Sequence, residues 1–321
     1  MRRRKRYCGV DARRGCWREP RFFTVIDARR SANYSWWSIA GRKRASMSVC
    51  AVATVDEPLR SKSGAAPVIA VQALSKIYPA RTGAVRALEA IDFEVADREF
   101  VAIVGPSGCG KSTLLKILAG LIPGSSGSAL LRGTPVTGPR RDIGMVFQAP
   151  VLFPWRTVMG NVLLPVDVQG LGRDRLHRSA LDLLRLVGLD GFENRYPWEL
   201  SGGMQQRVAM VRALIHDPAM LLMDEPFGAL DAMTREQMNL ELQRIWLERR
   251  KTVVFITHSI PEAVFLADRV LVMTARPGRI AEIVSVALPR PRSLDVMTTP
   301  EFGVYARRIR AHFSATGGLD G

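Results

Sequence analysis

Residues 105–113 read GPSGCGKST, and this stretch is the strongest indicator of the fold. It fits the pattern G-x-x-x-x-G-K-[ST] of a phosphate-binding loop, which arises by chance in about one chain in a hundred of this size. The apolar residues 100–104 before it have the length of a buried strand, and a helix is expected over 111–119. The glycines let backbone N–H groups close on phosphate oxygens, Lys111 reaches the β and γ phosphates, and the Ser112 hydroxyl is a ligand for Mg²⁺. The expected nucleotide site consists of Gly105, Pro106, Ser107, Gly108, Cys109, Gly110, Lys111, Ser112 and Thr113.

Apolar strands alternate with amphipathic helices along the rest of the chain. Further strands are expected at 68–74, 90–95, 129–132, 143–147, 220–223, 252–257, 269–273 and 280–286. Further helices are expected at 173–187, 204–214, 233–248 and 261–267. This alternation is typical of an α/β fold with a mostly parallel sheet covered on both faces. Three consecutive helical stretches between 157 and 214 interrupt it and indicate a helical insertion.

Two acidic residues follow a second apolar strand, in the stretch AMLLMDEP at 219–226. Alone, such a pair is as often a helix cap as a functional site. With the phosphate-binding loop upstream, we expect Asp224 at the carboxyl end of a strand beside that loop. There Asp224 can hold Mg²⁺, and Glu225 can orient or deprotonate an attacking water.

Two more polar residues follow strands in the same way. His258 closes the strand VVFITH at 253–258, and Gln148 follows the strand expected at 143–147. A lone histidine is more often a structural residue than a catalytic one. Because His258 falls at the edge where the γ-phosphate is expected, we favour hydrogen bonds from His258 to that phosphate and to Glu225.

The stretch LSGGMQQR at 200–207 places a serine and two glycines at a helix start, which is a second anion site. In their order, the motifs resemble those of the ATP-binding subunit of ABC transporters, over about residues 68–290. These are the phosphate-binding loop, Gln148 as the Q-loop, LSGGMQQR as the signature, LLMDEP, Asp231 as the D-loop and His258 as the switch histidine. Met204 stands where the family signature usually has glutamine.

The resemblance implies the fold and the ligands. The fold is an α/β P-loop NTPase core of the ABC ATPase type, with a mostly parallel sheet, an N-terminal antiparallel β subdomain and a helical insertion at about 149–214. The cofactors implied are ATP and Mg²⁺, with Tyr78 stacked on the adenine and Asp231 near the nucleotide. Ser112, Gln148 and Asp224 are the implied metal ligands, and Glu225, His258 and Gln148 are the implied catalytic residues.

The resemblance also implies an assembly. ATP-binding subunits of this family dimerise head to tail, so Ser201, Gly202 and Gly203 are expected to complete the partner's ATP site. We therefore expect a homodimer on the cytoplasmic face of the membrane, bound to integral-membrane permease subunits and served indirectly by a substrate-binding protein.

A finer resemblance concerns the transported substrate. The stretches QAPVLFPWRTVMGNV at 148–162, YPWELSGGMQQRVAMVRAL at 196–214 and RPGRI at 276–280 look like the nitrate, sulfonate and taurine importer group. LPRPR at 288–292 points the same way. In the family a permease helix docks just past the Q-loop, where Phe153, Pro154 and Trp155 lie. The alternative is that these three residues only pack the insertion.

The positive charge belongs mostly to one end of the chain. Of the net +16, residues 1–46 carry +11, with no helical or strand period. We expect residues 1–67 to be a basic extension, either a disordered tail or sequence upstream of a true start at Met47. The ATP-binding domain then spans 68–290, and 291–321 is a C-terminal tail with a short helix.

The residues alone leave three alternative functions to consider. An importer for another substrate, such as a metal or a polyamine, has a weaker match over 148–162. A soluble ABC ATPase acting on nucleic acid needs a long coiled-coil insertion or a second cassette, so no nucleic acid is expected. A P-loop kinase or GTPase gives no reason for the stretch LSGGMQQR.

Overall fold

The computed structural model describes residues 66–80, 83–274 and 276–314, all within one compact unit, Glu57–Gly321. Nearly all of the expected extension, 1–67, lies outside the described residues, so that expectation stays a prediction. Among the described residues, no helix combines the length and the apolar character needed to cross a bilayer.

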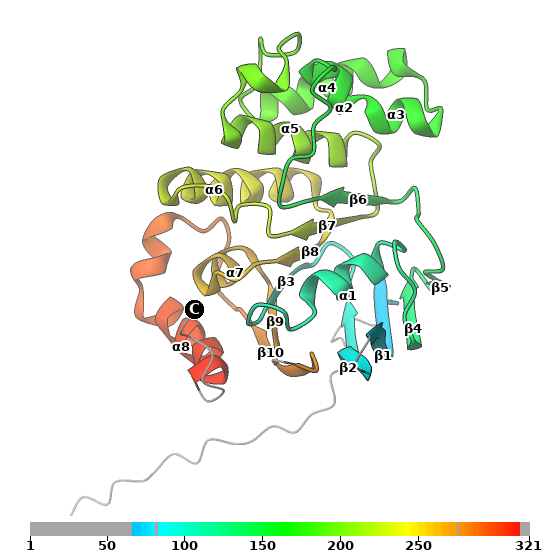
Figure 1. Cartoon of the computed structure of the whole chain (residues 1–321). Coiled ribbons are helices and arrows are strands. Elements are labelled where there is room, and N and C mark those ends of the chain that lie inside the picture. Colours follow the sequence, from blue (N-terminus) through cyan, green and yellow to red (C-terminus); the bar gives the residue numbers. More distant parts are fainter. Residues whose placement is uncertain (1–65, 81–82, 275, 315–321) are drawn as a thin grey trace, which may run out of the picture. The chain divides into compact units, whose positions relative to one another are not determined.

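A six-stranded sheet carries the expected site (Figure 1). Its order is β10 (Ile280–Ser285), β9 (Arg269–Met273), β3 (Phe100–Val104), β8 (Thr252–Ile256), β7 (Met220–Asp224) and β6 (Ile143–Val146). The strands from β9 to β6 pair in parallel, and β10 is antiparallel to β9. Every residue of β3 and β8 is buried, as expected for apolar strands covered on both faces. The predicted mostly parallel α/β sheet is confirmed.

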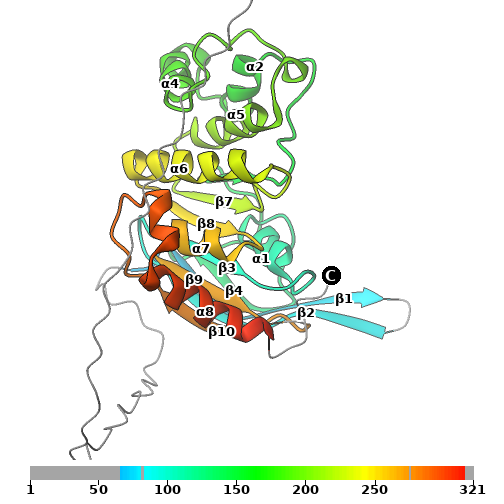
Figure 2. The same ribbon diagram turned by 90° about the vertical axis from the view of Figure 1, so that its left-hand side faces the viewer.

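Helices cover this sheet on opposite faces, as Figures 1 and 2 show. They are α1 (Lys111–Leu118), α6 (Ala232–Arg249), α7 (Ile260–Leu266) and α8 (Pro300–Ser314). Phe100, Ala102 and Val104 belong to the apolar cluster that includes α6 and α7, whereas Val101 and Ile103 belong to the cluster that includes α1. Because side chains alternate along a strand, β3 separates α1 from α6 and α7.

An antiparallel sheet packs on the other side of α1. Its order is β2 (Gly83–Val95), β1 (Ile69–Ala80), β4 (Ser126–Leu131) and β5 (Thr134–Pro135). Ile69 and Leu131 of this sheet share one buried cluster with Leu114 and Leu118 of α1. The predicted N-terminal antiparallel β subdomain is confirmed.

The helical insertion contains more helices than the three expected. They are α2 (Val158–Val162), α3 (Leu164–Gln169), α4 (Arg173–Leu186), the 3-10 turn η1 (Pro197–Glu199) and α5 (Gly202–Leu214). The fully buried Asn161 of α2 anchors the loop before it. Its side chain accepts from the Phe153 N–H at 2.7 Å and donates to the carbonyls of Phe153, Arg156 and Thr157 at 3.1, 3.0 and 3.0 Å.

The C-terminal part of the described chain packs on the α/β core. This C-terminal part forms the 3-10 helix η2 (Leu294–Thr298) and the 15-residue helix α8. Phe302 and Ile309 of α8 are buried in the cluster that contains α7.

Candidate functional site

The phosphate-binding loop follows β3 and ends at the first turn of α1. Gly105 has no room for a side chain, since a Cβ there would lie 2.8 Å from Cys109 Sγ and 2.9 Å from the Met273 carbonyl oxygen. Gly108 and Gly110 have φ angles of 73° and 101°, in the left-handed region that favours glycine. The glycines therefore allow the tight strand-to-helix turn that GPSGCGKST predicts.

Lys111 is a nearly buried cation at the start of α1. The residue is 6% exposed, and its Nζ donates to the carbonyl oxygens of Gly105 at 2.8 Å and Pro106 at 3.2 Å. Neither of these partners is charged, so the ammonium group remains suited to an anionic ligand. Burial raises the pKa of the adjacent Cys109 thiol, which keeps that side chain neutral.

Ser112 and Asp224 meet at the carboxyl edge of the large sheet. The Ser112 hydroxyl donates to Asp224 Oδ1 at 3.0 Å. Burial raises the pKa of Asp224 above its ordinary value, although the bond from Ser112 opposes this shift. Hydroxyl and carboxylate oxygens are ligands that Mg²⁺ prefers, and a bound cation favours the ionised carboxylate. The pair therefore fits a magnesium site.

Glu225 and His258 follow adjacent strands. β7 and β8 pair in parallel with Asp224 opposite Ile256, so the residues after each strand emerge side by side. His258 Nδ1 lies 3.4 Å from Glu225 Oε2. Glu225 has a φ of 45°, which is uncommon for a residue other than glycine, and its N–H donates to the Ile256 carbonyl at 3.0 Å. A carboxylate and an imidazole in contact at this edge can accept and pass on a proton.

Gln148 lies two residues beyond β6, near the loop that follows Glu225. The side-chain amide nitrogen of Gln148 is 3.4 Å from where a Cβ on Gly228 would lie. Within the described part of the chain, no hydrogen bond joins Gln148 to Ser112 or Asp224. The structure thus brings Gln148 to the Glu225 loop, whereas its expected metal contact stays a prediction.

A buried group behind His258 was missed in the sequence analysis. The Thr257 hydroxyl donates to Glu262 Oε2 at 2.6 Å, and Arg235 Nε lies 3.4 Å from Glu262 Oε1. Burial raises the pKa of Glu262, while Thr257 and Arg235 oppose that shift. Ser259 begins α7 by accepting from the Glu262 N–H at 3.3 Å. The spacing of Ser259 and Glu262 is that of a capping box, a signal that could have identified this helix start.

The signature residues lie at the exposed start of α5. Ser201 Oγ accepts from the Met204 N–H at 3.3 Å, and Ser201 and Gly202 are both exposed. A Cβ on Gly203 would lie 3.0 Å from Thr234 Cγ2, so this helix start adjoins the start of α6. The buried side chains of α5 and α6 share one cluster, whereas those of α1 belong to the other. The signature and the phosphate-binding loop are thus carried by helices on opposite faces of the sheet.

Asp231 and Tyr78 occupy more exposed positions. Asp231 begins α6, where its carboxylate accepts from the Thr234 N–H at 3.0 Å, and this bond lowers the pKa of Asp231. Tyr78 lies on β1 and is 37% exposed, with Lys76 Nζ 5.1 Å from the centre of its ring. The exposed part of the ring leaves space for a stacking partner, and the adenine contact stays a prediction.

Known proteins match this chain over the same region. The ABC transporter family matches residues 88–228, from β2 to the loop after Glu225. A taurine import ATP-binding protein of Burkholderia thailandensis is 52% identical over 207 residues, which cover 64% of this chain and 80% of the relative. An aliphatic sulfonates import ATP-binding protein of Bacillus cereus is 44% identical over 226 residues, which cover 70% of this chain and 88% of the relative.

A solved structure agrees with these relatives. It is an ATP-binding cassette in a dimeric, post-hydrolysis state bound to ADP and Pi, with a TM-score of 0.61 and 32% sequence identity. The match covers 69% of this chain and the whole of the solved chain. With the family match and the identities above, these findings place the chain in the ABC transporter family, among its ATP-binding proteins.

Proposed function

We propose that the chain is the ATP-hydrolysing subunit of an importer for a small anion or organosulfur compound, of the nitrate, sulfonate or taurine type. The proposed role in ATP hydrolysis rests on the Glu225–His258 contact of 3.4 Å beside the Ser112–Asp224 pair. The substrate class rests on the relatives named for import of taurine and aliphatic sulfonates. Both kinds of compound carry a sulfonate group.

Each polar residue of the site has a proposed role in hydrolysis. Lys111 and the loop N–H groups bind the β and γ phosphates, and Ser112, Asp224 and Gln148 hold Mg²⁺. When bound, Mg²⁺ supplies a positive charge beside the transferred phosphoryl group. Glu225 accepts a proton from the attacking water, and His258 orients Glu225 and hydrogen-bonds the γ-phosphate.

The proposed active form is a head-to-tail homodimer. The exposure of Ser201 and Gly202, on a helix across the sheet from α1, supports a role in a partner's site. In that arrangement the N–H groups at the start of α5 face the γ-phosphate bound by the other subunit. Asp231, at the exposed start of the adjoining α6, lies near the same interface.

Two aromatic pairs, each with an exposed tryptophan, support docking to a permease. The rings of Phe153 and Trp155 stack at 5.0 Å, and those of Tyr196 and Trp198 stack at 4.6 Å with planes 6° apart. Trp155 is 71% exposed and Trp198 is 66% exposed, which is unusual for side chains of this size. Their loops are joined, since the Val158 N–H donates to the Arg195 carbonyl at 2.7 Å. Docking here places the chain on the cytoplasmic face of the membrane, with a substrate-binding protein on the far side.

An uptake experiment tests the proposed substrate class. Cells lacking this chain, complemented with the wild type or with Glu225→Gln, are supplied with labelled taurine, an alkanesulfonate, nitrate, a polyamine or a divalent metal. We expect the wild type alone to restore uptake of a sulfonate or nitrate. Restoration of polyamine or metal uptake instead would reassign the substrate, and full uptake with Glu225→Gln would contradict the hydrolytic role.

A further inference from the structure

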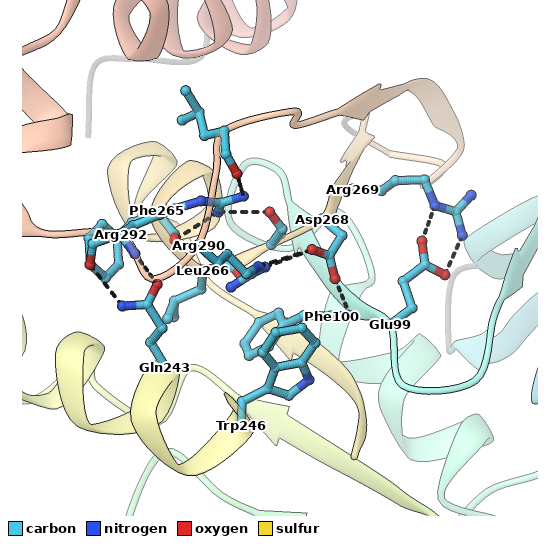
Figure 3. Close-up of polar contacts among 12 residues, drawn as sticks. Glu99, Phe100, Gln243, Trp246, Phe265, Leu266, Asp268, Arg269, Arg290 and Arg292 are labelled. Atoms are coloured by element: carbon cyan, nitrogen blue, oxygen red, sulfur yellow. Dashed lines mark hydrogen bonds and ion pairs between the residues drawn. The ribbon is translucent and has the colours of Figure 1, made fainter. Parts of the chain in front are cut away.

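We call residues 288–292, LPRPR, the C-terminal strap. It carries two arginines that lie between α6, α7 and the start of β3 (Figure 3). Arg292 is 2% exposed although it is charged. Burial, with a contribution from Arg290, lowers the pKa of Arg292 to about 10, so its guanidinium remains charged at neutral pH. A strap that buries a charge must have specific partners.

Arg292 binds the last turn of α7. Its Nη1 donates to the carbonyl oxygens of Val264, Phe265 and Ala267 at 2.9, 2.8 and 2.9 Å. These are carbonyls that the end of a helix leaves without backbone partners. The strap backbone is also tied to α6, because the Arg292 N–H donates to Gln243 Oε1 at 2.7 Å and Gln243 Nε2 donates to the Arg292 carbonyl at 2.8 Å.

Arg290 extends the network to β3. It donates to Asp268 Oδ1 at 2.9 Å and to the Leu266 carbonyl, and its guanidinium lies 4.4 Å from the centre of the Trp246 ring. The second oxygen of Asp268 accepts from the Phe100 N–H at 2.9 Å. Asp268 therefore joins the strap to the first residue of β3.

The opposite ends of these three elements carry the ATP site. β3 runs into Gly105 of the phosphate-binding loop, α7 begins two residues after His258, and α6 begins directly after Asp231. A seven-residue helix is about 10 Å long, so a shift at the last turn of α7 is passed to its first turn. The strap thus holds the far ends of the elements that place His258, Asp231 and the phosphates.

Stability alone is a weak explanation for this network. Replacing a whole buried ion pair with apolar side chains of similar volume is often neutral or stabilising, so a buried charge is weak evidence for a stabilising role. Arg292 Nε has no hydrogen-bond partner among the described residues, so one buried donor of this guanidinium is left unpaired. We propose that Arg292 is a positioning residue for ATP hydrolysis, which acts by fixing α7 and thereby His258 beside Glu225. This inference rests on the proposed roles of His258 and Glu225.

The test compares Arg292→Met with a control in the full chain. Leu131→Ala, a buried change in the antiparallel sheet, serves as a variant that lowers the melting temperature without touching the strap. We expect Arg292→Met to lower kcat about tenfold to a hundredfold, because small misplacements of catalytic groups have effects of this size. The KM for ATP should stay within about twofold, and Leu131→Ala should keep its kcat.

A milder variant covers the case in which Arg292→Met does not fold. Arg292→Lys keeps the charge but reaches fewer of the three carbonyls, and it should lower kcat less, again at unchanged KM. An unchanged kcat in the Arg292 variant that folds would overturn the proposal. A fall of kcat in Leu131→Ala as large as that in the Arg292 variant would also overturn it, because general destabilisation would then explain both. Glu225→Gln is assayed alongside: if it retains normal turnover, the catalytic assignment fails, and that result is distinct from a normal kcat in the Arg292 variants alone.

Discussion

At the scale of single residues, the site combines adjacent carboxylates that have different surroundings. Asp224 is tied to Ser112 and partly buried, whereas Glu225 turns toward His258. The left-handed backbone of Glu225 directs the two neighbouring side chains to different partners. One acid is thus suited to hold a metal ion and the other to accept a proton.

We predict that Asp224→Asn stabilises the chain while abolishing its activity. The raised folded-state pKa of Asp224 means that ionising this group destabilises the folded protein as pH rises through that pKa. Without nucleotide and metal, the melting temperature of the variant should exceed that of the wild type by roughly 2–5 °C at pH 7.5. The difference should shrink as pH falls and the wild-type carboxyl becomes protonated. Thermal melts at both pH values measure this, and a less stable variant at pH 7.5 would contradict the pKa shift.

We predict that Glu225→Gln binds ATP normally but hydrolyses it slowly. Glutamine keeps the shape and the hydrogen bonding of glutamate but cannot accept a proton. Turnover should fall by about a hundredfold or more, and an ATP-bound dimer should accumulate. Steady-state ATPase assays and size-exclusion chromatography with ATP test this, with wild type as the control. Near-normal hydrolysis would shift the role elsewhere, with His258 the first candidate.

At the scale of elements, α1 and α5 each have an N-terminus that is suited to bind an anion. α1 supplies the N–H groups after Gly110 in a loop whose Lys111 is nearly buried. α5 begins at an exposed serine and belongs to the other apolar cluster. A helix start that adjoins solvent and is carried on the opposite face of the sheet is better placed to act on another subunit.

We predict that the signature acts in trans, which a mixing experiment can test. Ser201→Arg should leave ATP binding by the monomer intact and prevent hydrolysis, while Lys111→Ala should abolish tight ATP binding. In a mixed dimer one site carries both changes and the other carries neither. A one-to-one mixture should regain roughly a quarter of wild-type activity if one intact site turns over alone, since half of the dimers are mixed.

The control for the mixing experiment is a cross-link that detects mixed dimers. A signature acting within its own chain predicts no recovery even when mixed dimers form. Loss of ATP binding by monomeric Ser201→Arg would contradict the trans arrangement directly.

At the scale of the whole molecule, the described residues form one unit that contains every expected site residue. The net charge of the chain is +16, yet residues 1–46 carry most of it. The structure from Val68 onward supplies both sheets and all the helices named above. Every residue of the proposed site lies between Tyr78 and His258, outside the basic segment.

We predict that removing residues 1–67 leaves ATPase activity within about twofold of the wild type and the melting temperature nearly unchanged. The deletion ends just before Val68, whose N–H donates to the Val95 carbonyl at 2.8 Å, so the antiparallel sheet is retained. Activity assays and thermal melts of both forms measure the outcome. A collapse of either quantity would show that the basic segment packs on the ATP-binding domain.

Elements with local signals could be predicted from the amino-acid sequence alone. The bounds expected for β3 and β9, 100–104 and 269–273, are those of the structure. The turn residues on either side of an apolar run mark where a strand begins and ends. The phosphate-binding pattern predicts the turn that follows β3. Each motif consists of a few consecutive residues, so the motifs and their order could be recognised in the sequence, and they identified the family.

Features that depend on distant residues could be seen only once the chain was folded. The hairpin of β1 and β2 extends past the expected strands 68–74 and 90–95. The added residues are exposed and show no apolar pattern, and they form strands because they pair with one another, as Tyr78 does with Val85. The burial of Arg292 was not foreseen, since arginine is mostly exposed in proteins. Its partner Gln243 is 49 residues away in the sequence, and the α7 carbonyls are 25 to 28 residues away. Such contacts arise only when helices and sheet pack together, and no local pattern of residues encodes them.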